Sequence, residues 1–166
     1  GEGGVENLRK GTTRLGAAIG EIRRISHDLR PSLLDTLGLS AAIDQQVREF
    51  EQRTSIRTQY ECGMAATDVA PEVSLTLFRI IQEALANVER HAKATTAIVS
   101  LTAQQGMIVL RVEDNGVGFD TNAADDSHGI GLRNIRERAD HHLGSVTLAS
   151  VHGRTELQVQ IPIVNA

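Results

Sequence analysis

The chain has 166 residues, a formal net charge of −4 and 40% hydrophobic residues. This length allows one good-sized domain, or a domain with an appendage, and the apolar content suffices for a core. Basic and acidic residues are interspersed, which gives no reason to expect a nucleic acid or a membrane surface as a partner. No apolar run reaches membrane-spanning length. A single cysteine, Cys62, excludes an internal disulfide framework and is typical of a reducing compartment.

The N-terminal part is predicted to be helical. Residues 1–4, Gly-Glu-Gly-Gly, are typical of a linker or cloning remnant, so we expect the sequence to be a piece of a longer protein. Over residues 5–29 a leucine or isoleucine recurs every seventh position, which predicts a coiled-coil-like helix. Three glycines weaken this helix, so it needs a partner helix. Pro31 is expected to end or kink it.

A connection and a second helix are expected next. Residues 32–38 read as a short leucine-rich connection. A helix then runs to about Arg53, because apolar residues recur at helical spacing along one face. These residues are Leu39, Ile43, Val47 and Phe50.

Strands and helices alternate in the remaining sequence. Residues 56–60 alternate like a short strand, and residues 62–70 read as a loop. Pro71 suits the first turn of a helix that carries a broad apolar stripe. Two strands are expected at residues 97–103 and 107–113, joined by a turn.

The last part of the chain begins with a polar segment. Residues 120–128 have no apolar periodicity and are predicted to form a mobile lid. Leu132, Ile135, Ala139 and Leu143 pattern the next helix, which Gly144 is expected to close. A hairpin that turns at residues 152–153 is predicted to complete the fold.

A glycine-containing loop follows the strand at residues 107–113. Asp114 at the strand end can accept a hydrogen bond from the exocyclic amine of a base, and Gly116 and Gly118 allow the backbone to approach a ligand closely. Alone, this pattern is also ordinary turn chemistry. Two further features accompany it. Polar residues stack at i+4 spacing on the preceding helix, and a second glycine pair opens the next one. They are Glu83, Asn87, His91, Gly129 and Gly131.

These motifs carry a resemblance to a known family. Residues 82–92 look like the N box of the ATP-binding domain of sensor histidine kinases, residues 114–119 look like its first glycine box, and residues 129–132 look like its second. This domain belongs to the superfamily of gyrase, heat-shock chaperone and mismatch-repair ATPases. Residues 23–39 and 132–139 resemble the subgroup of two-component kinases that signal to helix-turn-helix response regulators of the nitrate and degradative-enzyme type.

The resemblance implies an α+β fold. An α/β sandwich, with a mixed sheet under the helices that carry the boxes, would follow a helix of a dimerisation bundle. The chain would divide into a linker (1–4), part of the dimerisation and phosphotransfer region (5–53) and the catalytic ATP-binding domain (54–166). Whether this piece is a dimer, another oligomer or a monomer stays open.

The resemblance also implies roles for individual residues. Asp114 would accept from the adenine amine, while Gly116 and Gly118 would let the backbone close over the base. Asn87 would bind Mg²⁺ between the phosphates, with His91 nearby. Further nucleotide contacts are implied for the lid hinge, the N-terminus of the next helix and the last hairpin. The residues concerned are Gly129, Gly131, Leu132 and Thr155.

Two residues leave alternatives open. Glu83 would act as a general base or as a helper in proton transfer, or would hold a magnesium-bound water. His27 stands beside Asp28, as the phosphoacceptor of this group does. However, the Leu-Arg-Pro that follows resembles the second helix of the dimerisation hairpin, and the acceptor lies on the first. We therefore expect His27 to be a structural or bundle-surface histidine and the acceptor to lie upstream.

The implied function is transfer of the ATP γ-phosphoryl group to a histidine, for relay to a response regulator aspartate. The cofactors would be ATP and Mg²⁺, and the partners a helix-turn-helix response regulator and a second copy through the helical region. The expected location is cytoplasmic, with the parent protein free or anchored at the inner membrane. Two alternatives are a serine-directed kinase of the anti-sigma-factor type and a nucleotide-binding module without turnover.

Overall fold

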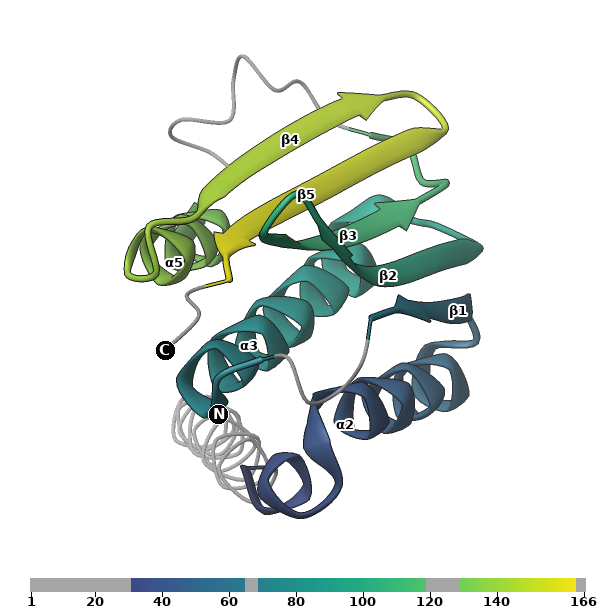
Figure 1. Cartoon of the computed structure of the whole chain (residues 1–166). Coiled ribbons are helices and arrows are strands. Elements are labelled where there is room, and N and C mark those ends of the chain that lie inside the picture. The colour runs from purple at the N-terminus through teal and green to yellow at the C-terminus, as the bar shows by residue number, and fades with distance from the viewer. Residues whose placement is uncertain (1–30, 65–68, 119–128, 164–166) are drawn as a thin grey trace, which may run out of the picture.

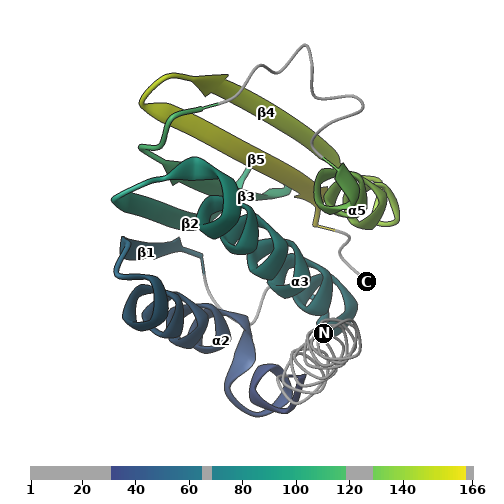
Figure 2. The ribbon, with the colours of Figure 1, turned by 180° about the vertical axis from the view of Figure 1, so that it is seen from behind.

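The computed structural model describes residues 31–64, 69–118 and 129–163. The predicted linker, the coiled-coil-like helix with His27, and the lid at residues 120–128 lie outside these ranges. The described chain forms two layers, with the helices on one face of a single five-stranded sheet (Figures 1 and 2). The helices are α2 (Pro31–Thr54), α3 (Pro71–Asn87), the π-helix η2 (Val88–Ala92) and α5 (Gly129–Asp140). The strands are β1 (Arg57–Gly63), β2 (Thr96–Gln104), β3 (Met107–Asp114), β4 (Ser145–Val151) and β5 (Arg154–Pro162).

The sheet is mixed, in the order β1-β2-β3-β5-β4. β1 pairs with β2 in parallel, and the other pairs are antiparallel. Alternate residues of the central strands are buried under α3, because side chains of a strand point to opposite faces in turn. The core is aliphatic with two buried phenylalanines, Phe50 and Phe78. This arrangement confirms the predicted α+β fold and both predicted hairpins, β2–β3 and β4–β5.

α2 differs from its prediction in the first part. Residues 32–38 were expected to form a connection, but α2 begins at Pro31 and is kinked at Gly38, which has φ 80° and ψ 172°. Proline is tolerated in the first helical turn because the N–H group it lacks has no partner there. Leu34 on the first segment and Leu39 after the kink are both buried, and this burial stabilises the helical start.

The second part of α2 confirms its predicted apolar face. Leu39, Ile43, Val47 and Phe50 are buried in the same core as α3 and the sheet. At its end, Arg53 pairs with Glu89 of η2. The division of the chain after Arg53 stays a prediction.

β1 is longer than its prediction at one end. The expected loop was to begin at Cys62, but the strand continues to Gly63, which pairs with Thr102 of β2. Parallel pairing with β2 therefore extends the strand beyond the alternating residues that the sequence displays.

α5 begins earlier and ends earlier than its predicted pattern. It starts at Gly129 instead of near Leu132, and it ends at Asp140. Leu143 was expected on its inner face, but this side chain is 84% exposed and its backbone is left-handed, with φ 57°. The chain turns here so that Gly144 N can donate to Ala139 O, which satisfies a carbonyl group at the helix end.

Replacing Leu143 with glycine is expected to stabilise the protein by about 0.5–1 kcal/mol. The left-handed backbone strains a leucine, and the exposed side chain contributes little burial. Thermal unfolding would measure the gain. A Leu143→Ala variant is the control, because it removes the side chain but keeps the strain. A destabilised Leu143→Gly protein would show that the leucine makes a stabilising contact.

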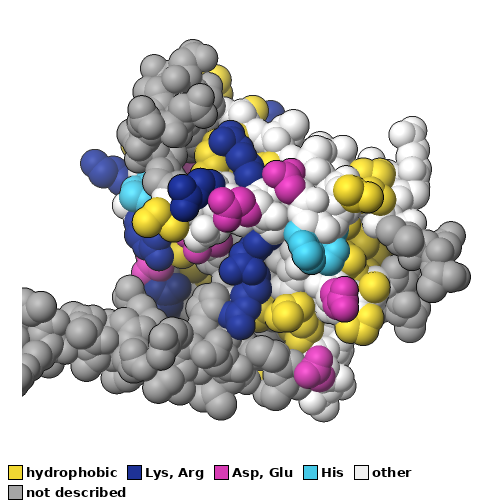
Figure 3. Space-filling model, turned by 90° about the vertical axis from the view of Figure 1, so that its left-hand side faces the viewer, with side chains coloured by type: hydrophobic (Ala, Val, Ile, Leu, Met, Phe, Trp, Pro, Cys, Tyr) yellow, Lys and Arg dark blue, Asp and Glu magenta, His cyan; other side chains and the backbone are white. Residues whose placement is uncertain are grey.

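The surface agrees with the interspersed charges of the sequence. On the face shown in Figure 3, Lys and Arg side chains alternate over short distances with Asp, Glu and hydrophobic ones. Among the described residues, no helix has the length and hydropathy needed to cross a membrane.

Candidate functional site

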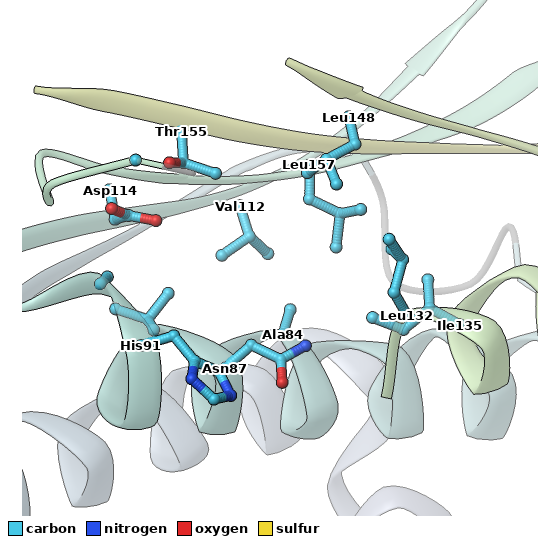
Figure 4. A pocket seen from close by; sticks show the side chains of 13 residues that line it. Ala84, Asn87, His91, Val112, Asp114, Leu132, Ile135, Leu148, Thr155 and Leu157 are labelled. Carbon is cyan, nitrogen blue, oxygen red and sulfur yellow. The ribbon is translucent and has the colours of Figure 1, made fainter. Parts of the chain in front are cut away.

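An open pocket lies between the helix layer and the sheet (Figure 4). α3 and η2 form one wall, β3, β4 and β5 form the opposite wall, and α5 contributes the end where Leu132 and Ile135 lie. The lining residues are Ala84, Asn87, Val88, His91, Ala92, Val112, Asp114, Gly118, Leu132, Ile135, Leu148, Thr155 and Leu157. Most of these side chains are apolar, so the few polar ones would fix the orientation of a ligand.

Two of the polar side chains lie together on the sheet wall. Asp114 ends β3, and Thr155 is its cross-strand partner on β5. Both are nearly buried, with exposed fractions of 6% and 9%. The Thr155 hydroxyl also lies 3.0 Å from Ser150 Oγ on β4. A carboxylate and a hydroxyl group therefore face the pocket side by side (Figure 4).

The carboxyl group of Asp114 is suited to accept a hydrogen bond from a ligand. Burial raises the pKa of this carboxyl group, and the Gly116 N–H group, which donates to Asp114 Oδ1 at 2.8 Å, partly offsets that rise in pKa. A donor from a ligand would also favour the charged form. The site can thus recognise an amine such as the exocyclic amine of a base.

The glycine loop is packed closely against the protein itself. A side chain at position 116 would clash with the carbonyl oxygen of Ala92. Gly118 has φ 70°, and a Cβ atom there would lie 2.5 Å from the Val151 carbonyl oxygen. The sequence predicted that these glycines allow a close approach to a ligand. The structure adds that both are needed for the loop to fit between η2 and the β4–β5 hairpin.

Backbone hydrogen bonds fix the loop on both sides. Val117 N donates to Ala92 O at 2.8 Å, and Gly153 N donates to Gly116 O at 2.9 Å. The first bond joins the loop to the end of η2, and the second joins it to the turn of the β4–β5 hairpin.

The helix wall carries the other predicted polar residues. Asn87 ends α3 and His91 lies in η2, and both side chains line the pocket. Glu83 lies one helical turn before Asn87, outside the lining set. A Cβ atom on Gly131 would clash with the Glu83 carboxylate and would lie 3.2 Å from Asn87 Oδ1. The first turn of α5 thus approaches these two side chains closely.

The structure brings most of the predicted site residues together. Asn87, His91, Asp114, Gly118, Leu132 and Thr155 line the pocket. Gly116 lies in the loop beside it, Glu83 and Gly131 meet at the α3–α5 contact, and Gly129 begins α5. The hinge role of Gly129 and Gly131 stays a prediction.

The sequence did not lead us to predict the apolar side chains with which the sheet lines the pocket. Val112, Leu148 and Leu157 were assigned to strands without a role at the site, yet they line the pocket. Val112 precedes Asp114 by two residues, so the period of a strand places both on one face. That signal could have found Val112. Leu148 and Leu157 pair with each other across the β4–β5 hairpin, as a turn at residues 152–153 requires. Their place at the pocket depends on the pairing of β5 with β3, which the sequence alone does not specify.

Comparison with known families decides the class of this site. Residues 72–165 match the model of the histidine kinase-, DNA gyrase B- and HSP90-like ATPases. The chain belongs to this family. ATP is therefore the nucleotide of this domain. The observed pocket fits this ligand, because an apolar cleft with one buried acceptor suits an adenine ring and its amine.

Three curated relatives of the chain are named as histidine kinases. The chain is 40% identical over 157 residues to the sensor histidine kinase MctS of Rhizobium johnstonii, covering 93% of the chain and 34% of the relative. It is 32% identical to the oxygen sensor histidine kinase NreB of Staphylococcus carnosus, covering 97% and 47%. The signal transduction histidine-protein kinase/phosphatase DegS of Brevibacillus brevis is 31% identical, with 96% and 40% covered. The chain thus spans less than half the length of these relatives.

Solved structures of histidine kinases share the fold. The blue-light activated histidine kinase of Erythrobacter litoralis EL346 superposes with a TM-score of 0.65 at 18% identity, covering 76% of this chain and 42% of that one. Histidine kinase AdeS of Acinetobacter baumannii gives 0.64 at 18% identity, covering 89% and 82%. Both likenesses agree with the α+β fold.

Proposed function

We propose that the chain is the ATP-binding catalytic region of a two-component sensor histidine kinase. It would transfer the γ-phosphoryl group of ATP to a histidine, from which a response regulator aspartate receives it. The observation that carries this proposal is the pairing of Asp114 with Thr155 in a mostly apolar pocket, opposite Asn87 and His91. The names of the three curated relatives favour a histidine kinase over a serine-directed kinase.

The sheet wall would bind the adenine end of the nucleotide. Asp114 accepts a hydrogen bond from the adenine amine, and Thr155 lies beside it to bond a neighbouring ring atom or water. Val112, Leu157 and Leu148 line the pocket, and they would contact the ring and exclude water from it. These contacts would orient the nucleotide, so catalysis would rest on positioning.

The helix wall would bind the phosphate end. When bound, ATP supplies the phosphoryl group, and Mg²⁺ neutralises charge on its phosphates. Among the described residues, no group of three His, Cys, Asp or Glu side chains could hold a metal ion. Mg²⁺ commonly takes one or two protein ligands and completes its shell with phosphate oxygens and water. Asn87 is the residue proposed to hold it, with the nearby Glu83 carboxylate on a bound water or as a helper in proton transfer.

The remaining parts of the reaction require segments outside the described residues. We place the acceptor histidine on a helix upstream of residues 5–29, so this piece would not phosphorylate itself alone. The partners would be a second copy, through the helical region, and a response regulator of the helix-turn-helix type. A cytoplasmic location would supply both ATP and the regulator.

A titration with a fluorescent ADP analogue tests the proposal. The purified chain is titrated with and without Mg²⁺, and unlabelled ADP then displaces the probe. We expect saturable binding that ADP reverses. A chain that is folded by circular dichroism but does not bind the analogue would contradict the proposed function.

Replacing Asn87 with alanine is expected to remove the Mg²⁺-dependent part of nucleotide affinity. The amide oxygen is the proposed protein ligand, whereas the adenine contacts are on the opposite wall. Affinity without Mg²⁺ should change by about threefold or less, since a single neutral hydrogen bond contributes little net free energy. Gln59→Ala, on the exposed face of the edge strand β1, is the control. An unchanged response to Mg²⁺ would exclude Asn87 as the metal ligand.

A further inference from the structure

Asn115 stands between Asp114 and Gly116 in the glycine loop, and it does not line the pocket. Its side chain nevertheless makes three hydrogen bonds. Oδ1 accepts from Thr95 N at 2.9 Å and from Thr96 N at 3.0 Å, and Nδ2 donates to Thr95 Oγ1 at 2.8 Å. Its backbone N–H group donates to Thr96 O at 3.3 Å. One residue thus makes four hydrogen bonds to two consecutive residues.

The two partners of Asn115 have a specific place in the fold. Thr95 is the last residue of the segment that joins η2 to β2, and Thr96 is the first residue of β2. They follow Lys93, which leaves η2 in the left-handed conformation with φ 50°. The side chain of Asn115 therefore ties the strand wall of the pocket, which carries Asp114, to the segment that continues the helix wall.

A second contact continues the same connection. Val117 N donates to Ala92 O at the last residue of η2. Asn115 and Val117 thus hold the loop against the segment 92–96 at two points, on either side of Gly116. Between them, the Gly116 N–H group is left pointing at Asp114 Oδ1. The orientation of the Asp114 carboxylate depends on this arrangement.

We propose that Asn115 is a positioning residue for nucleotide binding: it fixes the carboxylate of Asp114 relative to the helix wall and so sets the preference for adenine. This inference rests on the proposed function. Guanine presents an oxygen where adenine presents its amine, so a fixed carboxylate repels it. When the loop is released, affinity for ADP falls, while the weak affinity for GDP changes little.

The chemistry of the Asn115 side chain predicts which substitutions preserve nucleotide binding. Asparagine supplies an acceptor for two N–H groups and a donor for a hydroxyl oxygen. Aspartate keeps the acceptor, and the Thr95 hydroxyl group can rotate to donate to it. Alanine keeps neither. Thr95→Ala removes only one of the four hydrogen bonds.

The experiment measures ADP and GDP affinity on the full 166-residue chain, with amide hydrogen exchange across the loop and thermal unfolding. Asn115→Ala is expected to bind ADP at least about tenfold more weakly than the unchanged protein. The ratio of its ADP affinity to its GDP affinity should be smaller, and the amide hydrogen of Val117 should exchange faster. Asn115→Asp should stay within about threefold of the unchanged protein, and Thr95→Ala should fall between them. Gln158→Ala is the matched control, because it breaks a hydrogen bond to Arg111 on the opposite face of the sheet.

The outcomes separate the two hypotheses. Asn115→Ala with unchanged ADP affinity, or with ADP and GDP weakened equally, overturns the positioning role but leaves the proposed function in place. If Asn115→Ala does not fold, Thr95→Ala decides, and unchanged ADP affinity and exchange in that variant overturn the role. If the unsubstituted chain does not bind ADP, the proposed function fails, and this inference fails with it.

Discussion

Asp114→Asn is expected to lower ADP affinity by about 10- to 100-fold, because the buried carboxylate is a charged acceptor for the adenine amine. Asparagine has the same shape, and its oxygen can still accept from Gly116 N, so the loop should keep its conformation. Displacement of a fluorescent ADP analogue would measure the loss. Binding within about twofold of the unchanged protein would remove Asp114 from the adenine site.

The same variant carries a stability prediction that separates binding from folding. Burial raises the pKa of Asp114 above its value in the unfolded chain. Between these two pKa values the folded state holds more protons than the unfolded state, so the free energy of unfolding falls as the pH rises through that window. At neutral pH the buried, charged carboxylate thus destabilises the folded state, and Asp114→Asn removes this destabilisation.

Unfolding curves recorded at several pH values would test this sign. The stability of Asp114→Asn relative to the unchanged protein should increase as the pH rises from about 3 towards neutral. The variant should therefore lose binding without losing stability at neutral pH. An Asp114→Asn protein that is less stable at neutral pH would show that the carboxylate makes a net stabilising interaction in the folded state.

Gly118→Ala is expected to destabilise the fold by about 3 kcal/mol or more and to abolish nucleotide binding. Two costs add up at this position. The backbone is left-handed, with φ 70°, and the new methyl group would lie 2.5 Å from the carbonyl oxygen of Val151. The hairpin turn and the loop would have to separate, which would move the Asp114 carboxylate and open the pocket.

Gly106→Ala is the matched control for this substitution. Gly106 has a similar φ of 75°, but no atom lies within 4 Å of its Cβ position. Only the backbone cost of about 1–2 kcal/mol applies there, and nucleotide affinity should not change. Chemical denaturation of both variants measures the difference. Equal losses of stability would mean that Val151 can move away from the new methyl group without a loss of free energy.

Local patterns predicted most of the elements of this fold. Alternation in β2, β3 and β5 and the apolar stripe of α3 depend on residues near each other in sequence, so the sequence displays them directly. The errors fell where two signals compete. Residues 32–38 were expected to form a connection although Pro31 also suits a helix start, and Leu143 continued an apolar pattern after the helix had ended.

The candidate site was predicted as a set of residues but not as an arrangement. The boxes around Asn87, Asp114 and Gly131 could be found because they resemble the motifs of a known family. The pairing of Asp114 with Thr155 could not, because it depends on the register of two strands about 40 residues apart in the chain. The contact of Gly131 with Glu83 likewise depends on how α5 packs against α3.

The sequence by itself determined the order of the elements, because hydrophobic period and turn residues are local properties of the chain. Its motifs also resembled those of the family that the comparison shows, and this resemblance implied the fold class. The tertiary structure alone decided why Gly116 must be glycine, which apolar residues line the pocket, and that the Asn115 side chain bonds to Thr95 and Thr96. Each of these depends on the meeting of segments that are distant in the sequence, here the end of η2, the loop after β3 and the turn between β4 and β5.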